Sequence, residues 1–260
     1  MNPLETLLQT EGRVFVLECA RTSGLIVAAP LAWLNAPIRI RGALVLTLTF
    51  VVHGANDTSN VPNELLEVAW AIVTEFALGA AMGLVVRFIV AMSEVAAEAI
   101  APMLGLGVAQ LFDVSSHSNQ NILTSILRHL SILIALAIGV HRVLLHALLA
   151  GFKVIPVGSI HVPSGGLSVI WELSGQVLLV GARIALPLLA ILFVVQITLA
   201  FVSRAAPQLQ IFSVGFAVAT VVGLATLILV LPDISRGFVV EHSKVSSHLE
   251  RLFVDFGATQ

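Results

Sequence analysis

The sequence predicts an all-α, membrane-associated protein, and three features lead to this expectation. Apolar residues fill 58% of the 260 positions, whereas charged residues fill only 11%. A soluble domain carries roughly 25% charged residues, so this chain lacks the polar groups that a water-exposed surface needs. The mean hydropathy is +1.01. The apolar residues also gather in helical runs, several of them near the length of about 20 residues that a membrane-spanning helix needs.

Composition and motifs also exclude several classes of function. A net charge of −2 disfavours nucleic-acid binding, because no basic patch is available for phosphates. The single cysteine, Cys19, excludes internal disulfides and cysteine-based zinc sites. Gly105 and Gly107 lack the third glycine of a dinucleotide fingerprint, and His141 and His146 are not spaced as helical metal ligands. We therefore expect no enzymatic activity, no cofactor and no metal.

The first helix is expected within Val14 to Leu34, and its start is not that of a cleaved signal peptide. Glu18 and Arg21 are three residues apart in it, on one helical face where they can pair. A shorter apolar segment follows from Gly42 to Val52, and residues 54–63 have the composition of a loop.

A long helix is predicted from Leu65 to Ile100, and its charges set it apart from a lipid-facing span. An ionised side chain at bilayer depth costs about 2.5–3.5 kcal/mol on insertion scales. We therefore expect four of its charges, with two arginines from later segments, at protein–protein or pore-facing surfaces. The six are Glu75, Arg87, Glu94, Glu98, Arg128 and Arg183.

The second half of the chain begins after a break at Pro102, which is followed by a loop-like stretch at residues 105–121. A segment from Ile122 to Phe152 is next, and Pro156 to Gly166 is the clearest linker in the sequence. Further apolar segments run over residues 169–201 and 205–232. Residues 211–231 are the best single transmembrane candidate, and an amphipathic tail is expected from residue 233 to residue 260.

Small residues repeat every fourth position in two of the predicted helices, which lets helix backbones approach closely. We therefore expect helix packing at Gly79, Gly83, Gly215, Ala219 and Gly223.

Several motifs, in order, resemble the FliR/SctT family, the R-type subunit of the type III export gate of flagella and injectisomes. They are Arg21-Thr-Ser-Gly24, residues 36–41 (APIRIR), Glu75-Phe-Ala-Leu-Gly79, residues 105–113 (GLGVAQLFD), residues 182–187 (ARIALP) and residues 204–209 (RAAPQL). The resemblance covers most of the chain. Val114, Ala217 and Ala219 depart from the family pattern, in the loop and in the last hairpin.

The resemblance implies kinked helical hairpins in which a P-type part is fused to a Q-type part. Residues 1–158 would be the P-type part, 159–166 the linker, and 167–260 the Q-type hairpin with its amphipathic tail. The implied partners are P-type and Q-type subunits, the B-type switch subunit (FlhB/SctU) and unfolded export substrates. The implied location is the bacterial inner membrane at the base of the secretion apparatus, with much of the assembly on the periplasmic side.

The resemblance also implies that residues 105–121 project into a central pore as a plug. The plug residues would be Gly105, Gly107, Gln110, Leu111, Phe112 and Asp113.

Two other functions remain open from the residues. Glu94 and Glu98 are four residues apart, so a proton-coupled secondary transporter that uses them as a proton site is one alternative. An intramembrane hydrolase is the other, although the sequence offers no recognisable pair of nucleophile and base.

Overall fold

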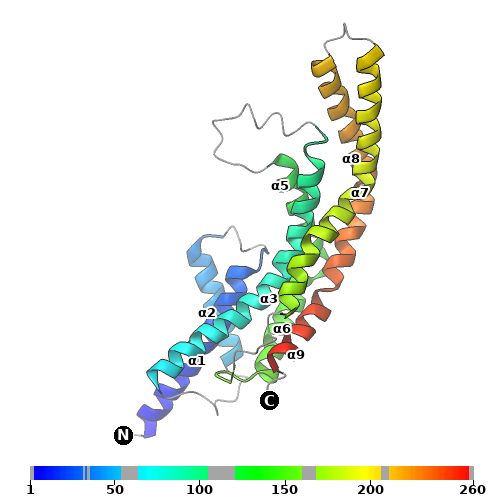
Figure 1. Cartoon of the computed structure of the whole chain (residues 1–260). Helices are drawn as coiled ribbons and strands as arrows, with labels where there is room; N and C mark the ends of the chain where they lie inside the picture. Colours follow the sequence, from blue (N-terminus) through cyan, green and yellow to red (C-terminus); the bar gives the residue numbers. More distant parts are fainter. Residues whose placement is uncertain are drawn as a thin grey trace. The chain divides into compact units, whose positions relative to one another are not determined.

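A computed structural model of the chain describes residues 3–31, 33, 36–53, 64–104, 121–159, 168–205 and 211–257. Within these ranges every regular element is a helix, which confirms the all-α prediction (Figure 1). In chain order the helices are α1 (Pro3–Ala28), α2 (Ile38–His53), α3 (Leu65–Ile100), α5 (Ile122–Ile138), α6 (Val140–Val154), α7 (Ser168–Ala205), α8 (Ile211–Ser243) and α9 (Val245–Gly257).

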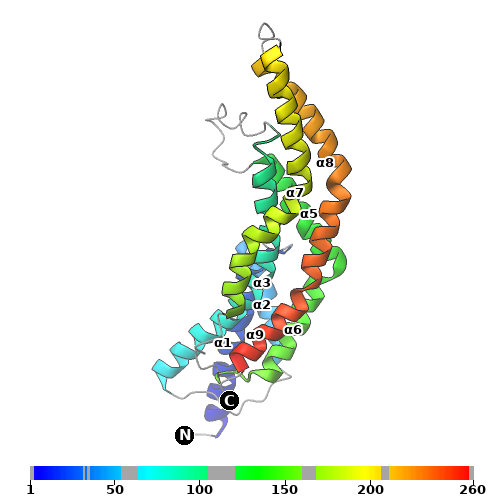
Figure 2. The same cartoon turned by 45° about the vertical axis from the view of Figure 1, so that its right-hand side comes forward.

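The chain forms two compact units. The first consists of Met1–Phe88, Ala135–Ser174 and His242–Gln260, and the second of Ile89–Ile134 and Gly175–Glu241. Within the first unit α1 packs along α2, and α6 lies along α9, as Figures 1 and 2 both show.

The second unit has a core built from four helices. The end of α3, α5, α7 and α8 each contribute buried side chains to one apolar cluster, among them Leu104, Leu127, Leu188 and Phe238. The turn after α3, residues 101–104, belongs to this core, because Ala101 and Leu104 are fully buried.

Among the described residues, three helical stretches are long and apolar enough to cross a membrane: Leu65–Ile100, Ser168–Val202 and Ala217–Phe256. The pair α5 and α6 would make a fourth span if the two helices are counted together. The most apolar window of α3 is 61% buried, whereas those of the other two stretches are 28% and 22% buried. The apolar faces of α7 and α8 therefore need lipid or other protein to cover them.

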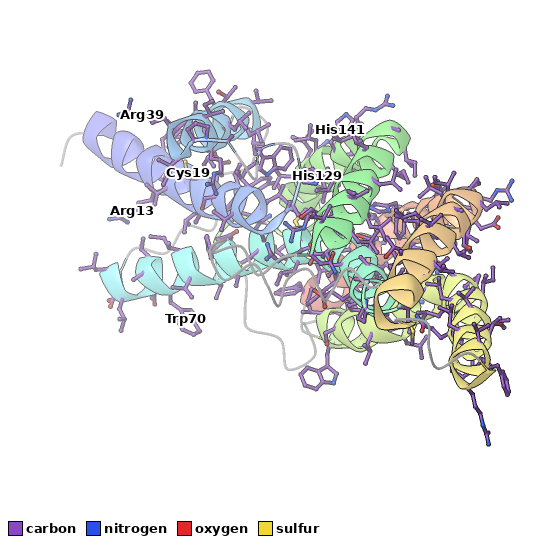
Figure 3. All side chains as sticks on the ribbon, turned by 90° about the horizontal axis from the view of Figure 1, so that it is seen from above. Arg13, Cys19, Arg39, Trp70, His129 and His141 are labelled. Atoms are coloured by element: carbon purple, nitrogen blue, oxygen red, sulfur yellow. The ribbon has the colours of Figure 1, made fainter. Side chains whose placement is uncertain are left out.

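The N-terminal half of α3 also carries an exposed apolar face. Trp70 is 60% exposed, and in Figure 3 its side chain points away from α1 and α2.

Two boundaries differ from the sequence predictions. The segment from Ile122 to Phe152 breaks at Gly139, whose φ of 91° lies in the left-handed region that favours glycine. The apolar run that was expected to end at Pro232 instead continues as α8 to Ser243, with the proline inside the helix. Ile234 and Phe238 beyond the proline are buried in the core of the second unit, and this packing holds the helix together.

Candidate functional site

Arg21 lies in a polar network of the first unit, and its side chain is fully buried. Its Nε donates to Glu75 Oε2 of α3 at 2.6 Å. Its terminal nitrogens donate to the carbonyl oxygens of Gly151 and Ile155 at 3.1 Å, and its guanidinium lies 4.3 Å from the centroid of the Phe152 ring. The Gly151 carbonyl also accepts from the backbone nitrogen of Ile155 at 2.9 Å, so this side chain of α1 adds further bonds to the carbonyls at the end of α6.

Glu75 completes the network from α3. Its second carboxylate oxygen, Oε1, accepts a hydrogen bond from the backbone nitrogen of Gly158 at 2.9 Å. Both oxygens of this buried carboxylate are therefore bonded, as a buried charge requires. The pair ties α1 and α3 to the turn at residues 156–159, where the predicted linker begins.

Glu18 and Arg21, which their spacing would allow to pair, do not pair with each other. Glu18 instead faces His53 of α2, with 2.9 Å between Oε2 and Nδ1, while Arg21 faces α3 and α6. Spacing along one helix gave no information about these partners, because both come from segments more than 30 residues away. His53 also approaches Glu11, with 3.5 Å between Nε2 and Oε2.

Glycines bring α1 and α3 into close contact beside this network. A Cβ atom on Gly79 would lie 1.8 Å from the carbonyl oxygen of Arg21, and one on Gly24 would lie 2.2 Å from that of Phe76. One turn further on, a Cβ on Gly83 would meet the end of α1 at under 3.0 Å. No other residue type fits these crossings unless the helices move apart, so Gly79 and Gly83 sit at a backbone-to-backbone contact.

The second unit holds its own ion pair. Arg128 Nε of α5 donates to Glu94 Oε1 of α3 at 2.5 Å. The Arg128 side chain is 25% exposed and the Glu94 side chain is 31% exposed. Two of the six charges singled out in the sequence therefore pair with each other, and they join α5 to α3.

Three of the six charges are not paired in this way. Arg87, Glu98 and Arg183 are exposed in the isolated chain. Within the described ranges no hydrogen bond or salt bridge is found for these three side chains. Because they sit in long apolar helices, they need water or a partner subunit around them.

The turn at residues 101–104 is held by two side chains from neighbouring helices. Thr220 Oγ1 of α8 donates to the carbonyl oxygen of Leu104 at 3.0 Å, and Gln196 Nε2 of α7 donates to that of Met103 at 3.3 Å. Past residues 105–120, Asn121 Oδ1 accepts from the nitrogen of Leu123 at the start of α5. Leu123 is buried in the same core. Both flanks of the predicted plug are therefore anchored in the second unit.

The predicted plug residues themselves, Gly105, Gly107, Gln110, Leu111, Phe112 and Asp113, lie outside the described residues.

The last small-residue series lies in α8. Gly215 is half-buried, Ala219 is buried, and Gly223 faces Leu104, since a Cβ there would lie 2.2 Å from Leu104 Cδ2.

Sequence reasoning missed Gln196, Thr220 and the partners of Arg21. The available signal for the first two was a polar side chain inside an apolar helix, which usually has a specific partner. Across the described ranges, no group of three or more His, Cys, Asp or Glu side chains is placed to hold a metal ion.

Comparison with known proteins identifies a matching family and several similar proteins. Residues 13–244 match the family described as bacterial export proteins, family 1. The flagellar biosynthetic protein FliR of Escherichia coli K12 is 29% identical over 216 residues, which cover 83% of each chain. Proteins of the same name from Aquifex aeolicus and Bacillus subtilis are 29% identical over 200 residues and 22% identical over 244 residues. These matches cover 76% and 92% of the present chain, and 77% and 92% of the relatives.

Proposed function

Because this chain belongs to the bacterial export proteins, family 1, we propose that it is the R-type subunit of a protein export gate of the flagellar type. It is a component of the export apparatus in the bacterial inner membrane, with apolar helices suited to that location. In this role it forms, with P-type and Q-type subunits, a helical pore for unfolded substrate proteins. The B-type switch subunit is the further partner, and much of the assembly lies on the periplasmic side.

The observation that carries this proposal is the coverage of the family match, which includes residues 13–244 of 260. The geometry adds support. Exposed arginine and glutamate side chains at Arg87, Glu98 and Arg183 suit a subunit whose helices are covered by other proteins. The bare apolar faces of α7 and α8 suit the same arrangement.

The role is a passage for proteins and not a catalytic one, so the energy for export comes from other components. A proton-coupled transporter is less well supported, because Glu94 is engaged by Arg128 at 2.5 Å and so holds two helices together. Residues 1–158 act in this proposal as the P-type part and residues 167–260 as the Q-type part.

Residues 105–121 act as the plug of the pore. Support comes from the flanks of this segment, because Leu104 is fixed by Thr220 and Leu123 is buried in the core. A plug needs such a firm base if it is to block a pore by steric bulk. Leu111 and Phe112 supply that bulk, and closure is partly by dewetting.

Deletion of residues 110–118 tests the plug. We expect the variant to copurify with P-type and Q-type subunits as the wild type does, while cells become permeable to small solutes. Unchanged permeability with normal assembly would remove the plug role and leave the subunit role intact.

A further inference from the structure

The end of α2 is joined to α1 by a histidine ring that lies between two carboxylates. His53, the last residue of α2, has its Nδ1 atom 2.9 Å from Glu18 Oε2 and its Nε2 atom 3.5 Å from Glu11 Oε2. The ring also meets Phe15 edge to face, with 5.5 Å between the ring centroids. Glu11, Phe15 and Glu18 follow the helical spacing i, i+4, i+7, so they share one face of α1.

We propose that Glu11, Phe15, Glu18 and His53 form a protonation-dependent clasp between α1 and α2. The clasp is closed on both carboxylates when the imidazole ring carries two N–H groups, and it releases Glu11 when the ring carries one. It involves α1 and α2 alone, so it does not depend on the proposed function.

The number of N–H groups on the ring sets how many carboxylates it can hold. The imidazolium ion donates from both nitrogens, whereas the neutral ring has one N–H group and one lone pair. The Glu18 side chain is fully buried, and a buried carboxylate is costly without donors, so the remaining N–H group stays with Glu18. The lone pair of Nε2 then faces Glu11, whose side chain is 48% exposed and can turn away into water.

The charged groups found against the ring among the described residues come from α1 and α2. On α1 they are Glu11 and Glu18, and Arg21, one turn beyond Glu18, bonds Glu75 of α3. From α2 the carbonyl oxygens of the last turn contribute the partial negative charge of a helix C-terminus. The second ring proton therefore decides whether Glu11 is attracted to the end of α2 or turned away from it.

Water can deliver and remove this proton. Neither α1 nor α2 belongs to the three described stretches that are long and apolar enough to cross a membrane, and the His53 side chain is 27% exposed. Histidine is the side chain that ordinarily changes charge between about pH 5 and about pH 8. Rising pH should therefore release the start of α1 from the end of α2, while the contact with Glu18 remains.

The test measures the distance between the start of α1 and the end of α2 in the full chain. Spin labels are attached at Gly12→Cys and Phe50→Cys, after Cys19→Ala has removed the native thiol. A Cβ atom on Gly12 has nothing within 4 Å, and Phe50 is 77% exposed, so both positions accept a label. Exposed ion pairs change an equilibrium by up to about fivefold. We expect the ratio of close to parted labels to fall about threefold from about pH 5.5 to about pH 8.

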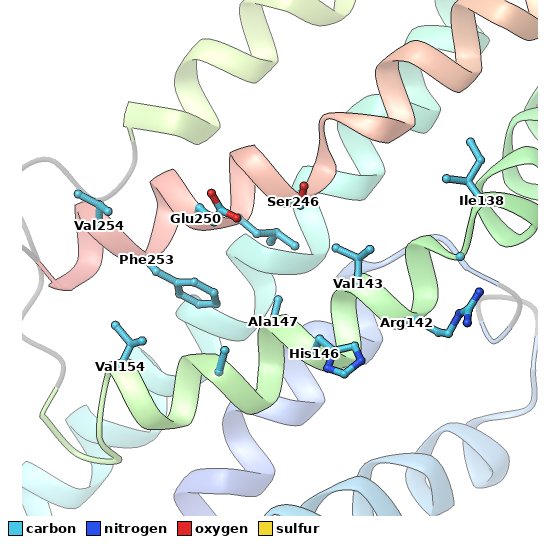
Figure 4. Close-up of a pocket in the computed structure, with 13 residues that line it drawn as sticks. Ile138, Arg142, Val143, His146, Ala147, Val154, Ser246, Glu250, Phe253 and Val254 are labelled. Carbon is cyan, nitrogen blue, oxygen red and sulfur yellow. The ribbon is translucent and has the colours of Figure 1, made fainter.

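Three substitutions in this labelled chain separate the clasp from other titrating groups. Glu11→Gln removes the charge of an exposed side chain and keeps its shape, and His53→Gln removes the titrating ring. In both variants we expect the same distances at the two pH values. His146→Gln is the matched control, because His146 is an exposed histidine of the same unit that lines the groove between α6 and α9 (Figure 4). This variant should respond to pH as the labelled chain does.

Three results would overturn the proposal. One is a labelled chain whose distances do not change with pH. Another is a pH response that persists in Glu11→Gln or in His53→Gln. The third is a response that His146→Gln also abolishes. Glu11→Gln keeps the test decisive even if His53→Gln fails to fold, because the side chain that it alters is 48% exposed.

Discussion

Removal of the Arg21 side chain is the sharpest test of the buried network. In Arg21→Ala the carboxylate of Glu75 stays fully buried, and it keeps only its bond from the nitrogen of Gly158. The carbonyl oxygens of Gly151 and Ile155 also lose their side-chain donor. We therefore expect a large loss of stability.

The magnitude follows from these contacts. Removing one partner of a buried ion pair costs about 3–5 kcal/mol, because the other charge is left uncompensated. The carbonyl oxygen of Ile155, which loses its bonds from Arg21, adds about 1–3 kcal/mol where water does not reach it, whereas that of Gly151 keeps its bond from the Ile155 nitrogen. Even the lower figure is a large share of the about 5–15 kcal/mol by which a typical protein is stable.

The assay is thermal unfolding of the complex in detergent, together with the amount of full-length chain in the membrane. Arg236→Ala is the matched control, because Arg236 forms a salt bridge with Asp233 at 3.2 Å while its side chain is 81% exposed. An exposed pair of this kind contributes about 0–1 kcal/mol. The double variant Arg21→Met, Glu75→Leu should recover the part of the loss that comes from the uncompensated Glu75 carboxylate, since apolar groups of similar volume often replace a buried pair at little cost. The bonds to the Ile155 oxygen and from the Gly158 nitrogen stay lost.

Two results would refute this reasoning. One is a stability change in Arg21→Ala no larger than that in Arg236→Ala. The other is a double variant that is as unstable as the sum of its two single variants, because that would mean that the two side chains do not act on each other.

Three further predictions concern the helix contacts. Gly79→Ala should lower the melting temperature of the complex, because its Cβ would lie 1.8 Å from a backbone oxygen. Gly175→Ala, whose Cβ would have nothing within 4 Å, should leave the melting temperature unchanged or raise it, because alanine stabilises a helix interior by about 0.5–1 kcal/mol relative to glycine. Arg128→Glu should reduce the yield of folded chain, and the added change Glu94→Arg should restore it; a double variant as poor as the single one would speak against the pair. Thr220→Val should cost about 1 kcal/mol and speed amide exchange in the turn after α3, and unchanged exchange there would show that its hydrogen bond is not needed.

The sequence predicted helix content well where the apolar pattern was long and uninterrupted. The bounds of α3, Leu65–Ile100, agree with the predicted run, because a loop-like stretch that ends in Pro62 and Asn63 precedes it and Pro102 follows it. At Pro232 the expectation that the apolar helical run ends at a proline was wrong. A proline disfavours the helix interior, but here the buried side chains beyond it keep α8 continuous.

Side-chain partners were the harder part. The position of Arg21 in a helix is visible from sequence, but its bonds reach Glu75, 54 residues away, and Ile155, 134 residues away. Only tertiary packing sets such distances. For the same reason the bonds from Gln196 and Thr220 to the turn after α3 had no signature beyond the presence of a polar side chain in an apolar helix.

The central claim is that this chain is one subunit of a multi-subunit export gate. Affinity purification of the tagged full-length chain from native membranes, followed by native mass spectrometry, tests it most directly. We predict a complex that contains this chain with several P-type and Q-type subunits, and little free chain. A well-folded, monodisperse monomer in detergent, with no export subunit bound, would contradict the account.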